Sequence, residues 1–153
     1  MGSIWKPHVT VAAVIEQHGR YLVVEESIEG KTVYNQPAGH LEPGESLIDA
    51  VIRETREESA WRFTPEALTG IYLWDQPGAS RTFLRFAFCG AHSHHRPEQS
   101  LDQGILRALW LSRDELAARA EQLRSPLVLQ CIDDHAAGRR YPLDCLHTLM
   151  PAG

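Results

Sequence analysis

Short runs of β-branched and aromatic residues, separated by turn-forming residues, fill the first quarter of the chain. Residues 9–15 and 21–26 are typical of buried strands, and the His-Gly pair between them favours a turn, so the two runs predict a hairpin. Residues 32–36 predict a further short extended segment. The stretch 37–45 is rich in glycine and proline and is predicted to be a loop.

A helical pattern begins at Ser46, whose hydroxyl is suited to cap free backbone amides, with Asp49 as its partner three residues later. The apolar positions that follow recur with helical spacing: Leu47, Ile48, Val51, Ile52 and Thr55. This stripe predicts an amphipathic helix that packs on a sheet.

The second half of the chain repeats both kinds of pattern. Strands are predicted over 68–74, 82–89 and 105–111, the first two joined as a hairpin by a turn at 75–80. Helices are predicted to begin at Ser112 and at Ser125, and a short extended segment over 141–146. Because no repeat, linker or low-complexity segment divides the chain, we expect one domain over residues 1–153.

Carboxylates are concentrated on the first predicted helix. Glu54, Glu57 and Glu58 lie at i, i+3 and i+4, so all three project from one face, where like charges repel. A solvated charged face is the ordinary alternative, but only Arg53 and Arg56 are near enough to offset the repulsion. A divalent cation that prefers oxygen ligands would stabilise such a face. Glu45, just before the helix, is placed to form a brace with Arg53.

Composition and charge exclude several classes of protein. The net charge of -5 and pI near 5.9 give no overall basic field, which argues against a nucleic-acid partner. Three widely spaced cysteines without a Cys-x-x-Cys pair fit reduced thiols better than a disulfide framework. The N-terminal apolar run is too short to span a membrane and lacks a signal-peptide layout. We therefore expect a soluble, cytoplasmic protein.

Two further places are candidates for chemistry. Arg85 lies among apolar residues of a predicted strand and needs either a substrate phosphate or a structural ion pair, two alternatives that the sequence leaves equal. In the polar stretch 92–104, three histidines lack the spacing of a zinc site and are interpreted as exposed loop residues. Glu98 and Asp102 in this loop could serve as a catalytic base that reaches over a metal site.

The stretch GHLEPGESLIDAVIRETREESAW resembles the Nudix box of Nudix hydrolases. The family pattern is a glycine, a glutamate six residues later, an Arg-Glu pair and then a Glu-Glu pair, matched here by Gly39, Glu45, Arg53-Glu54 and Glu57-Glu58. Thr55 and Trp61 replace aliphatic residues and Ala60 replaces a glycine, but no carboxylate is lost. Since alanine resists positive φ, we expect the helix to end without the usual left-handed residue.

The resemblance extends beyond the box. The segments KPHVTVA, VVEE, NQPAGHLE, FLRFAF, RSPLV and GRRYPL, in their order and spacing, resemble the NudJ subgroup of bacterial phosphatases. The resemblance implies an α/β Nudix fold, a mixed β-sheet sandwiched between helices. It also implies an enzyme, a phosphoric anhydride hydrolase that uses Mg²⁺, with Mn²⁺ as a substitute.

The family motif carries over to individual residues of this chain. It implies that Glu54, Glu57 and Glu58 bind the metal together with the backbone carbonyl near Ala38, and that Arg53 orients the glutamates. The resemblance leaves the base open between a box glutamate and a loop carboxylate. We favour Glu57, with Glu98 or Asp102 as the alternative.

The NudJ subgroup implies phosphatase activity on nucleoside tri- and diphosphates and on the pyrophosphates of thiamine and its hydroxymethylpyrimidine precursor. Two alternatives stay open: another Nudix substrate, such as an oxidised nucleotide, a dinucleoside polyphosphate or capped RNA, and a non-catalytic nucleotide sensor. Besides Arg85, we place His8, Gln36 and His40 near the substrate, although packing alone is the more frequent role of such residues. A monomer or a homodimer is expected.

Overall fold

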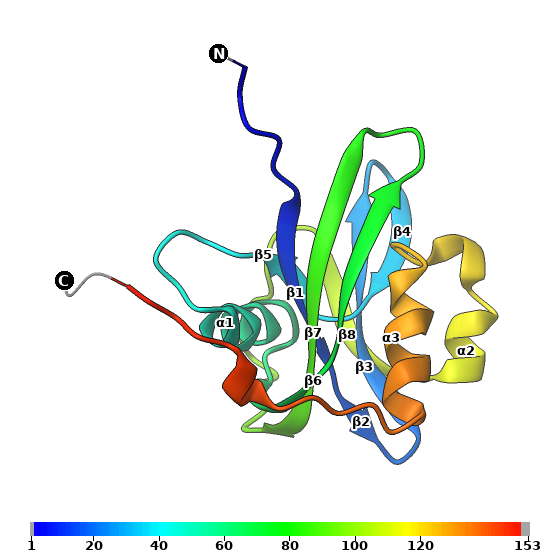
Figure 1. Cartoon of the computed structure of the whole chain (residues 1–153). Helices are drawn as coiled ribbons and strands as arrows, with labels where there is room; N and C mark the ends of the chain where they lie inside the picture. Colours follow the sequence, from blue (N-terminus) through cyan, green and yellow to red (C-terminus); the bar gives the residue numbers. More distant parts are fainter. Residues whose placement is uncertain (1, 151–153) are drawn as a thin grey trace.

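The computed structural model describes residues 2–150 and is built around two four-stranded β-sheets (Figure 1). The strands are β1 (His8–Val14), β2 (Glu16–Gln17), β3 (Arg20–Ile28), β4 (Lys31–Asn35), β5 (Ala38–His40), β6 (Arg62–Gln76), β7 (Arg81–Ser93) and β8 (Ile105–Ser112). The helices are α1 (Leu47–Ser59), α2 (Arg113–Ala117) and α3 (Leu127–Ala136), with short 3-10 turns η1 (Ala120–Gln122) and η2 (Leu143–Cys145). Among the described residues, no helix is long and apolar enough to cross a membrane.

The first sheet is mixed and has the strand order β5-β1-β7-β6. β1 pairs in parallel with β7 and antiparallel with β5, while β6 and β7 form the long antiparallel hairpin that the sequence predicts. The β1–β7 register sets Thr10 opposite Arg85. The β1–β5 register sets Val11 opposite Gly39. Residues from three distant segments therefore meet at the centre of this sheet.

The second sheet is antiparallel, with β3 paired to β2, β4 and β8. The predicted opening hairpin is only partly present, because the chain changes sheet after β1. β1 stays in the mixed sheet, and only the two residues of β2 pair back onto β3. The predicted strands over 32–36 and 105–111 are confirmed as β4 and β8.

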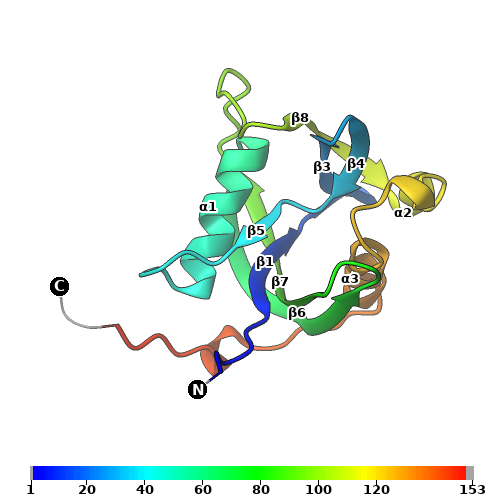
Figure 2. The ribbon, with the colours of Figure 1, turned by 90° about the horizontal axis from the view of Figure 1, so that it is seen from above.

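Helices cover both sides of the strands. Seen from above, α1 lies on one side of the mixed sheet and α3 on the other (Figure 2). The predicted α/β class, with a mixed sheet between helices, is confirmed, although the strands divide between two sheets.

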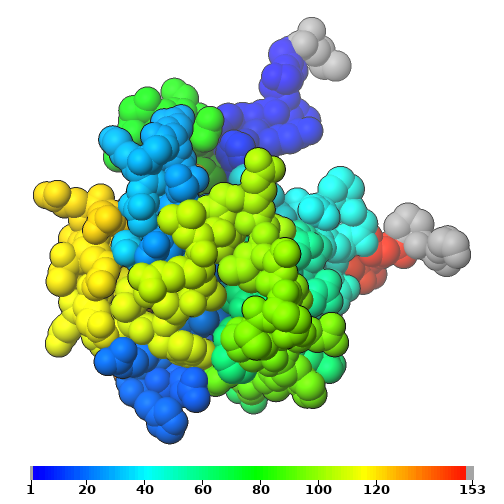
Figure 3. Space-filling model, turned by 180° about the vertical axis from the view of Figure 1, so that it is seen from behind, coloured from blue at the N-terminus to red at the C-terminus, as the bar shows by residue number. Residues whose placement is uncertain are grey.

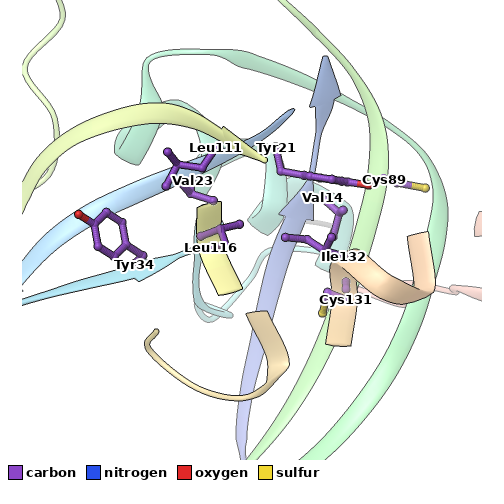
Figure 4. Packing of buried hydrophobic residues seen from close by; sticks show 10 residues of the cluster. Val14, Tyr21, Val23, Tyr34, Cys89, Leu111, Leu116, Cys131 and Ile132 are labelled. Atoms are coloured by element: carbon purple, nitrogen blue, oxygen red, sulfur yellow. The ribbon is translucent and has the colours of Figure 1, made fainter. Parts of the chain in front are cut away.

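Two hydrophobic cores follow from the alternation of side chains along β1. Val11, Ala13 and Ile15 pack in a core with Val51 of α1 and other buried residues. Val14 faces the other way, into a core with residues of β3, α2 and α3, among them Val23, Leu116, Cys131 and Ile132 (Figure 4). Because both faces of β1 are buried, the sheet is held firmly where it meets α1.

Three local predictions need correction. The predicted loop 37–45 contains the strand β5, which the pairing with β1 creates. The segment 141–146 forms the turn η2, and only Tyr141 makes a β-bridge, with Leu68. Ala60 ends α1 in the left-handed conformation, at φ 63° and ψ 15°, so the expectation of a different exit was wrong. Its carbonyl accepts a hydrogen bond from the Arg96 amide at 3.0 Å, which holds this strained residue in place.

Candidate active site

The cap and packing of α1 fix the direction of its acidic residues. The Ser46 hydroxyl accepts a hydrogen bond from the Asp49 amide at 3.0 Å, as predicted. Ala50, Val51 and Thr55 are buried against the sheet. Thr55 is accepted in place of an aliphatic residue because its hydroxyl donates to the Val51 carbonyl at 2.7 Å within the same helix. The remaining faces of the helix carry Arg53 and the glutamates.

Carboxylates from α1 and from the loop after β7 converge. One oxygen each of Glu54, Glu57 and Asp102 lies within 4.8 Å of the others. The loop is attached to the helix here, since the Asp102 amide donates to the Glu57 carbonyl at 3.0 Å. Figure 3 shows this segment, in lime green, lying over the end of α1. Three carboxylates at this separation provide the hard oxygen donors that Mg²⁺ and Mn²⁺ prefer, so the residues present fit a divalent cation.

Arg53 binds the acidic residues together. Its guanidinium donates to both oxygens of Glu45, at 3.0 and 2.7 Å, which is the brace expected from the sequence. It also donates to Glu54 at 2.9 Å and to Glu57 at 3.2 Å. The hydrogen bond from Arg53 lowers the pKa of Glu45, and the bond to Glu45 raises that of Arg53. Arg53 therefore offsets the repulsion between the glutamates and fixes their orientation.

Glu58 is placed differently from the other two box glutamates. Its carboxylate accepts a hydrogen bond from the Ala38 amide at 2.8 Å, which ties α1 to β5. Burial raises the pKa of Glu58 to about 8, against the effect of this hydrogen bond. Among the described residues, the third carboxylate of the close cluster, beside Glu54 and Glu57, is Asp102 and not Glu58.

A pocket of about 240 Å³ adjoins the carboxylates. Ala38, Gly39 and Glu58 form the part of its wall that leads to the cluster. Gly39 is packed so tightly that an added Cβ atom would lie 2.5 Å from Oε2 of Glu54 and closer to two other atoms of that carboxyl group. Trp74 and Phe83, with stacked rings 5.8 Å apart, supply an aromatic wall. The pocket can hold a small ring next to the acidic cluster.

Arg85 lines this pocket and is only 5% exposed. Its guanidinium donates to the amide oxygens of Gln36 at 3.0 Å and Asn35 at 3.2 Å. Within residues 2–150 Arg85 forms no ion pair. Of the two partners that the sequence left open, a structural carboxylate is therefore not present there. The hydrogen-bond partners of Arg85 among these residues, Gln36, Asn35 and Cys131, are all neutral.

Of the other three residues predicted to contact the substrate, His40 lines the pocket and His8 and Gln36 do not. His40 lines the pocket, and its Nε2 lies 3.1 Å from Nδ1 of His8. Burial, followed by the nearby His8, lowers the pKa of His40. Gln36 is buried and bridges Arg85 to the Val128 carbonyl, a packing role. Of the two loop acids, Asp102 joins the cluster, whereas Glu98 is exposed and does not.

Several residues of the pocket wall were not among the predicted site residues. Arg124 and Ser125 line it from the segment before α3, and the Arg124 amide is fixed by the Tyr34 carbonyl at 2.8 Å. Both residues belong to the RSPLV segment that carries the resemblance to the NudJ subgroup, which was the available signal. Phe83 and Glu26 lie in the FLRFAF and VVEE segments and had the same signal, whereas Trp74 lies in none of these segments. They reach the pocket only through strand pairing.

Comparisons with known proteins agree with this geometry. The NUDIX domain family model matches residues 5–131. Phosphatase NudJ from Escherichia coli strain K12 and from Shigella boydii are each 42% identical over 143 residues, which cover 94% of this chain and 92% of theirs. The structure of a NUDIX hydrolase from Nitrosomonas europaea superposes with a TM-score of 0.93 at 53% identity and covers 96% of this chain and all of that one.

A MutT NUDIX hydrolase from Burkholderia pseudomallei is only 17% identical but superposes with a TM-score of 0.71. The match covers 85% of this chain and 98% of that one and supports the assignment of the fold. The family match spans most of the chain, and the relatives are similar over nearly its whole length. The chain belongs to the Nudix family and is a Nudix hydrolase that resembles the NudJ phosphatases.

Proposed function

We propose that this Nudix hydrolase is a magnesium-dependent phosphatase. Its substrates would be nucleoside tri- and diphosphates and thiamine-type pyrophosphates, namely hydroxymethylpyrimidine pyrophosphate and thiamine pyrophosphate, from which it removes phosphate or pyrophosphate. The observation that carries the proposal is the cluster of Glu54, Glu57 and Asp102 oxygens within 4.8 Å of one another, separated from a ring-sized pocket by Gly39.

Glu54 and Glu57 would hold the metal, with Asp102 as a third carboxylate. In the resemblance to the family, Glu58 and the backbone carbonyl near Ala38 complete the ligand set. When bound, the ion supplies charge neutralisation at the phosphate oxygens and lowers the pKa of a coordinated water. Arg53 keeps the glutamates in the required orientation through four hydrogen bonds to Glu45, Glu54 and Glu57.

The base that accepts the proton of the attacking water would be a carboxylate of this cluster. Glu57 is our first assignment and Asp102 the loop alternative, because each places an oxygen at the cluster. Glu98, the other loop alternative, lies outside the cluster on an exposed stretch.

The pocket supports the substrate class. Arg85 and Arg124 bring two guanidinium groups to its wall, where phosphate oxygens would provide the anionic partner that Arg85 lacks. The stacked rings of Trp74 and Phe83 suit a planar heterocycle. A volume of about 240 Å³ favours one small ring over a dinucleotide. The similarity to the NudJ phosphatases points the same way.

A magnesium-dependent phosphate-release assay tests this proposal. The panel contains the nucleoside phosphates and thiamine-type pyrophosphates, together with an oxidised nucleotide, a dinucleoside polyphosphate and a capped RNA as alternative Nudix substrates. Glu57→Gln should reduce turnover by about 10³-fold or more while the circular dichroism spectrum stays unchanged. Glu66→Gln, an exposed glutamate on β6, is the matched control and should keep full activity.

Wild-type-like turnover in Glu57→Gln would sink the assignment of this residue. No release from any compound would instead favour a non-catalytic nucleotide sensor. As part of the same proposal we place the protein in the cytoplasm, as a monomer or a homodimer without a nucleic-acid partner. The three cysteines, all free, agree with a reducing compartment.

A further inference from the structure

A second cavity, of about 350 Å³, lies at the C-terminal end of α1. Three arginines line it: Arg56 from α1, Arg62 from the start of β6 and Arg96 from the loop after β7. It shares no lining residue with the substrate pocket. The remaining walls include His94 and Gln99.

All three arginines are exposed, and among the described residues they differ from five of the other ten arginines in having no carboxylate partner. Arg20, Arg53, Arg107, Arg113 and Arg139 each have a carboxylate within 4.0 Å. In the part of the chain that the structure describes, Arg56, Arg62 and Arg96 have none, although acidic residues outnumber basic ones by 20 to 15. Like charges around one cavity repel, so an anion bound there would relieve an unbalanced arrangement.

Free carbonyl groups at a helix C-terminus repel negative charge, and two carbonyl groups beside this cavity are hydrogen-bonded. Here the Arg56 carbonyl accepts a hydrogen bond from Gln99 Nε2 at 2.8 Å. The Ala60 carbonyl accepts one from the Arg96 amide at 3.0 Å. The same two bonds fix the backbone of the loop that carries Arg96 next to the end of α1.

We propose that this cavity is a second anion site that binds the phosphate group, either as free inorganic phosphate or as the phosphoryl group of a nucleotide. The planar guanidinium groups of Arg56, Arg62 and Arg96 donate paired hydrogen bonds to tetrahedral oxyanions. His94, which is exposed, lines the same cavity.

The site is connected to the carboxylate cluster through the loop itself. Arg96 and Gln99 hold one part of the loop against α1, and three residues beyond Gln99 the Asp102 amide donates to the Glu57 carbonyl. An anion that fixes Arg96 therefore restrains the segment that presents Asp102 to the cluster. Phosphate would in this way stabilise the arrangement of the active site from outside it.

Binding is measured by nuclear magnetic resonance titration of the full chain with inorganic phosphate in the presence of EDTA, which prevents metal-mediated binding at the carboxylates. We expect saturable shifts of the Ala60, Arg96 and Gln99 amides. Arg62→Gln/Arg96→Gln should weaken this binding at least tenfold, since two charged hydrogen-bonding groups are lost. Lys31→Gln/Arg81→Gln removes the same charge at the first residues of β4 and β7, which are exposed and do not line this cavity, and should bind phosphate as the wild type does.

The proposal is overturned if these amides do not shift, if both double variants bind equally, or if only amides of the substrate pocket such as Arg124 and Ser125 respond. A parallel titration with adenosine monophosphate distinguishes free inorganic phosphate from the phosphoryl group of a nucleotide as the ligand. Equal affinity supports free phosphate as the ligand, and tighter binding of the nucleotide supports a phosphoryl group.

Amide hydrogen exchange tests the connection to the active site. Saturating phosphate should slow exchange at the Asp102 amide in the wild-type protein and in Lys31→Gln/Arg81→Gln. At the same phosphate concentration the slowing should be smaller in Arg62→Gln/Arg96→Gln, because this variant binds phosphate at least tenfold more weakly. Exchange at Asp102 that is the same with and without phosphate in the wild-type protein contradicts the coupling.

Discussion

Gly39 on β5 faces the carboxyl group of Glu54 on α1, and Gly39→Ala tests whether that close packing positions the metal site. The backbone of Gly39 is not in the left-handed region, so alanine is compatible with its φ. The only obstacle is the new methyl group. It would lie 2.5 Å from Oε2 of Glu54 and closer to the other atoms of the carboxyl group.

The size of the effect follows from contact distances. Non-bonded heavy atoms prefer about 3.5–4.0 Å, so the Glu54 carboxyl group has to move by roughly 1 Å or more. Misplacement by 1 Å lowers catalytic rates by about 10²-fold, which corresponds to about 2.7 kcal/mol in the activation free energy. Overpacking at this site should lower the free energy of unfolding by about 1–3 kcal/mol. Activity is thus expected to fall far more than the folded fraction does.

The assay compares kcat/KM for phosphate release and the free energy of unfolding in urea for Gly39→Ala and Gly90→Ala. A methyl group at Gly90 would lie 2.9 Å from the Glu66 nitrogen, between β6 and β7, and outside the acidic cluster. Gly90→Ala should therefore lose stability but keep the activity of each folded molecule. A kcat/KM of Gly39→Ala within threefold of wild type contradicts this prediction. So does a loss of activity that, in both variants, is no greater than the loss of folded protein.

Three further predictions follow from single residues. Arg53→Ala should lower the free energy of unfolding by about 3 kcal/mol, because it leaves four carboxylates, those of Glu42, Glu45, Glu54 and Glu57, without their shared partner. Arg53→Lys should recover only part of this loss, and an unfolding curve like that of wild type contradicts the prediction. Asp102→Asn should reduce kcat about 10²-fold or more in the phosphate-release assay, while the kcat of Glu98→Gln stays near that of wild type. The reverse order would assign the role of the loop carboxylate to Glu98. Burial, and after it the charge of Arg140, lowers the pKa of His135 from 6.5 in the folded protein. Below pH 6.5 the unfolded chain therefore binds more protons at this residue than the folded chain does, so the free energy of unfolding falls as the pH is lowered. The fall between pH 7 and 5.5, measured by urea unfolding, should be shallower in His135→Gln; an equal slope contradicts the burial argument.

The sequence alone determined the features that depend on local periodicity. The strands 9–15, 32–36 and 105–111 and the helix that begins after Ser46 were predicted from spacing and are present. Of the three glutamates predicted to lie together, Glu54 and Glu57 do so in the close cluster, and Glu58 does not. The brace between Glu45 and Arg53 was predicted because Glu45 lies just before the helix and Arg53 beside its acidic face, and it is formed. These features repeat every few residues, so a short stretch of chain contains the information for each of them.

The tertiary structure decided whatever depends on residues far apart in the chain. It brought Asp102 and not Glu98 to the carboxylates, turned Glu58 toward Ala38, and gave Arg85 neutral partners from β4 and the adjoining Gln36. It also placed Arg124 and Ser125 in the pocket wall and held Ala60 in a conformation that alanine by itself disfavours. The physical reason is that sheet order, loop anchoring and burial are set by long-range hydrogen bonds and packing, which no local pattern encodes.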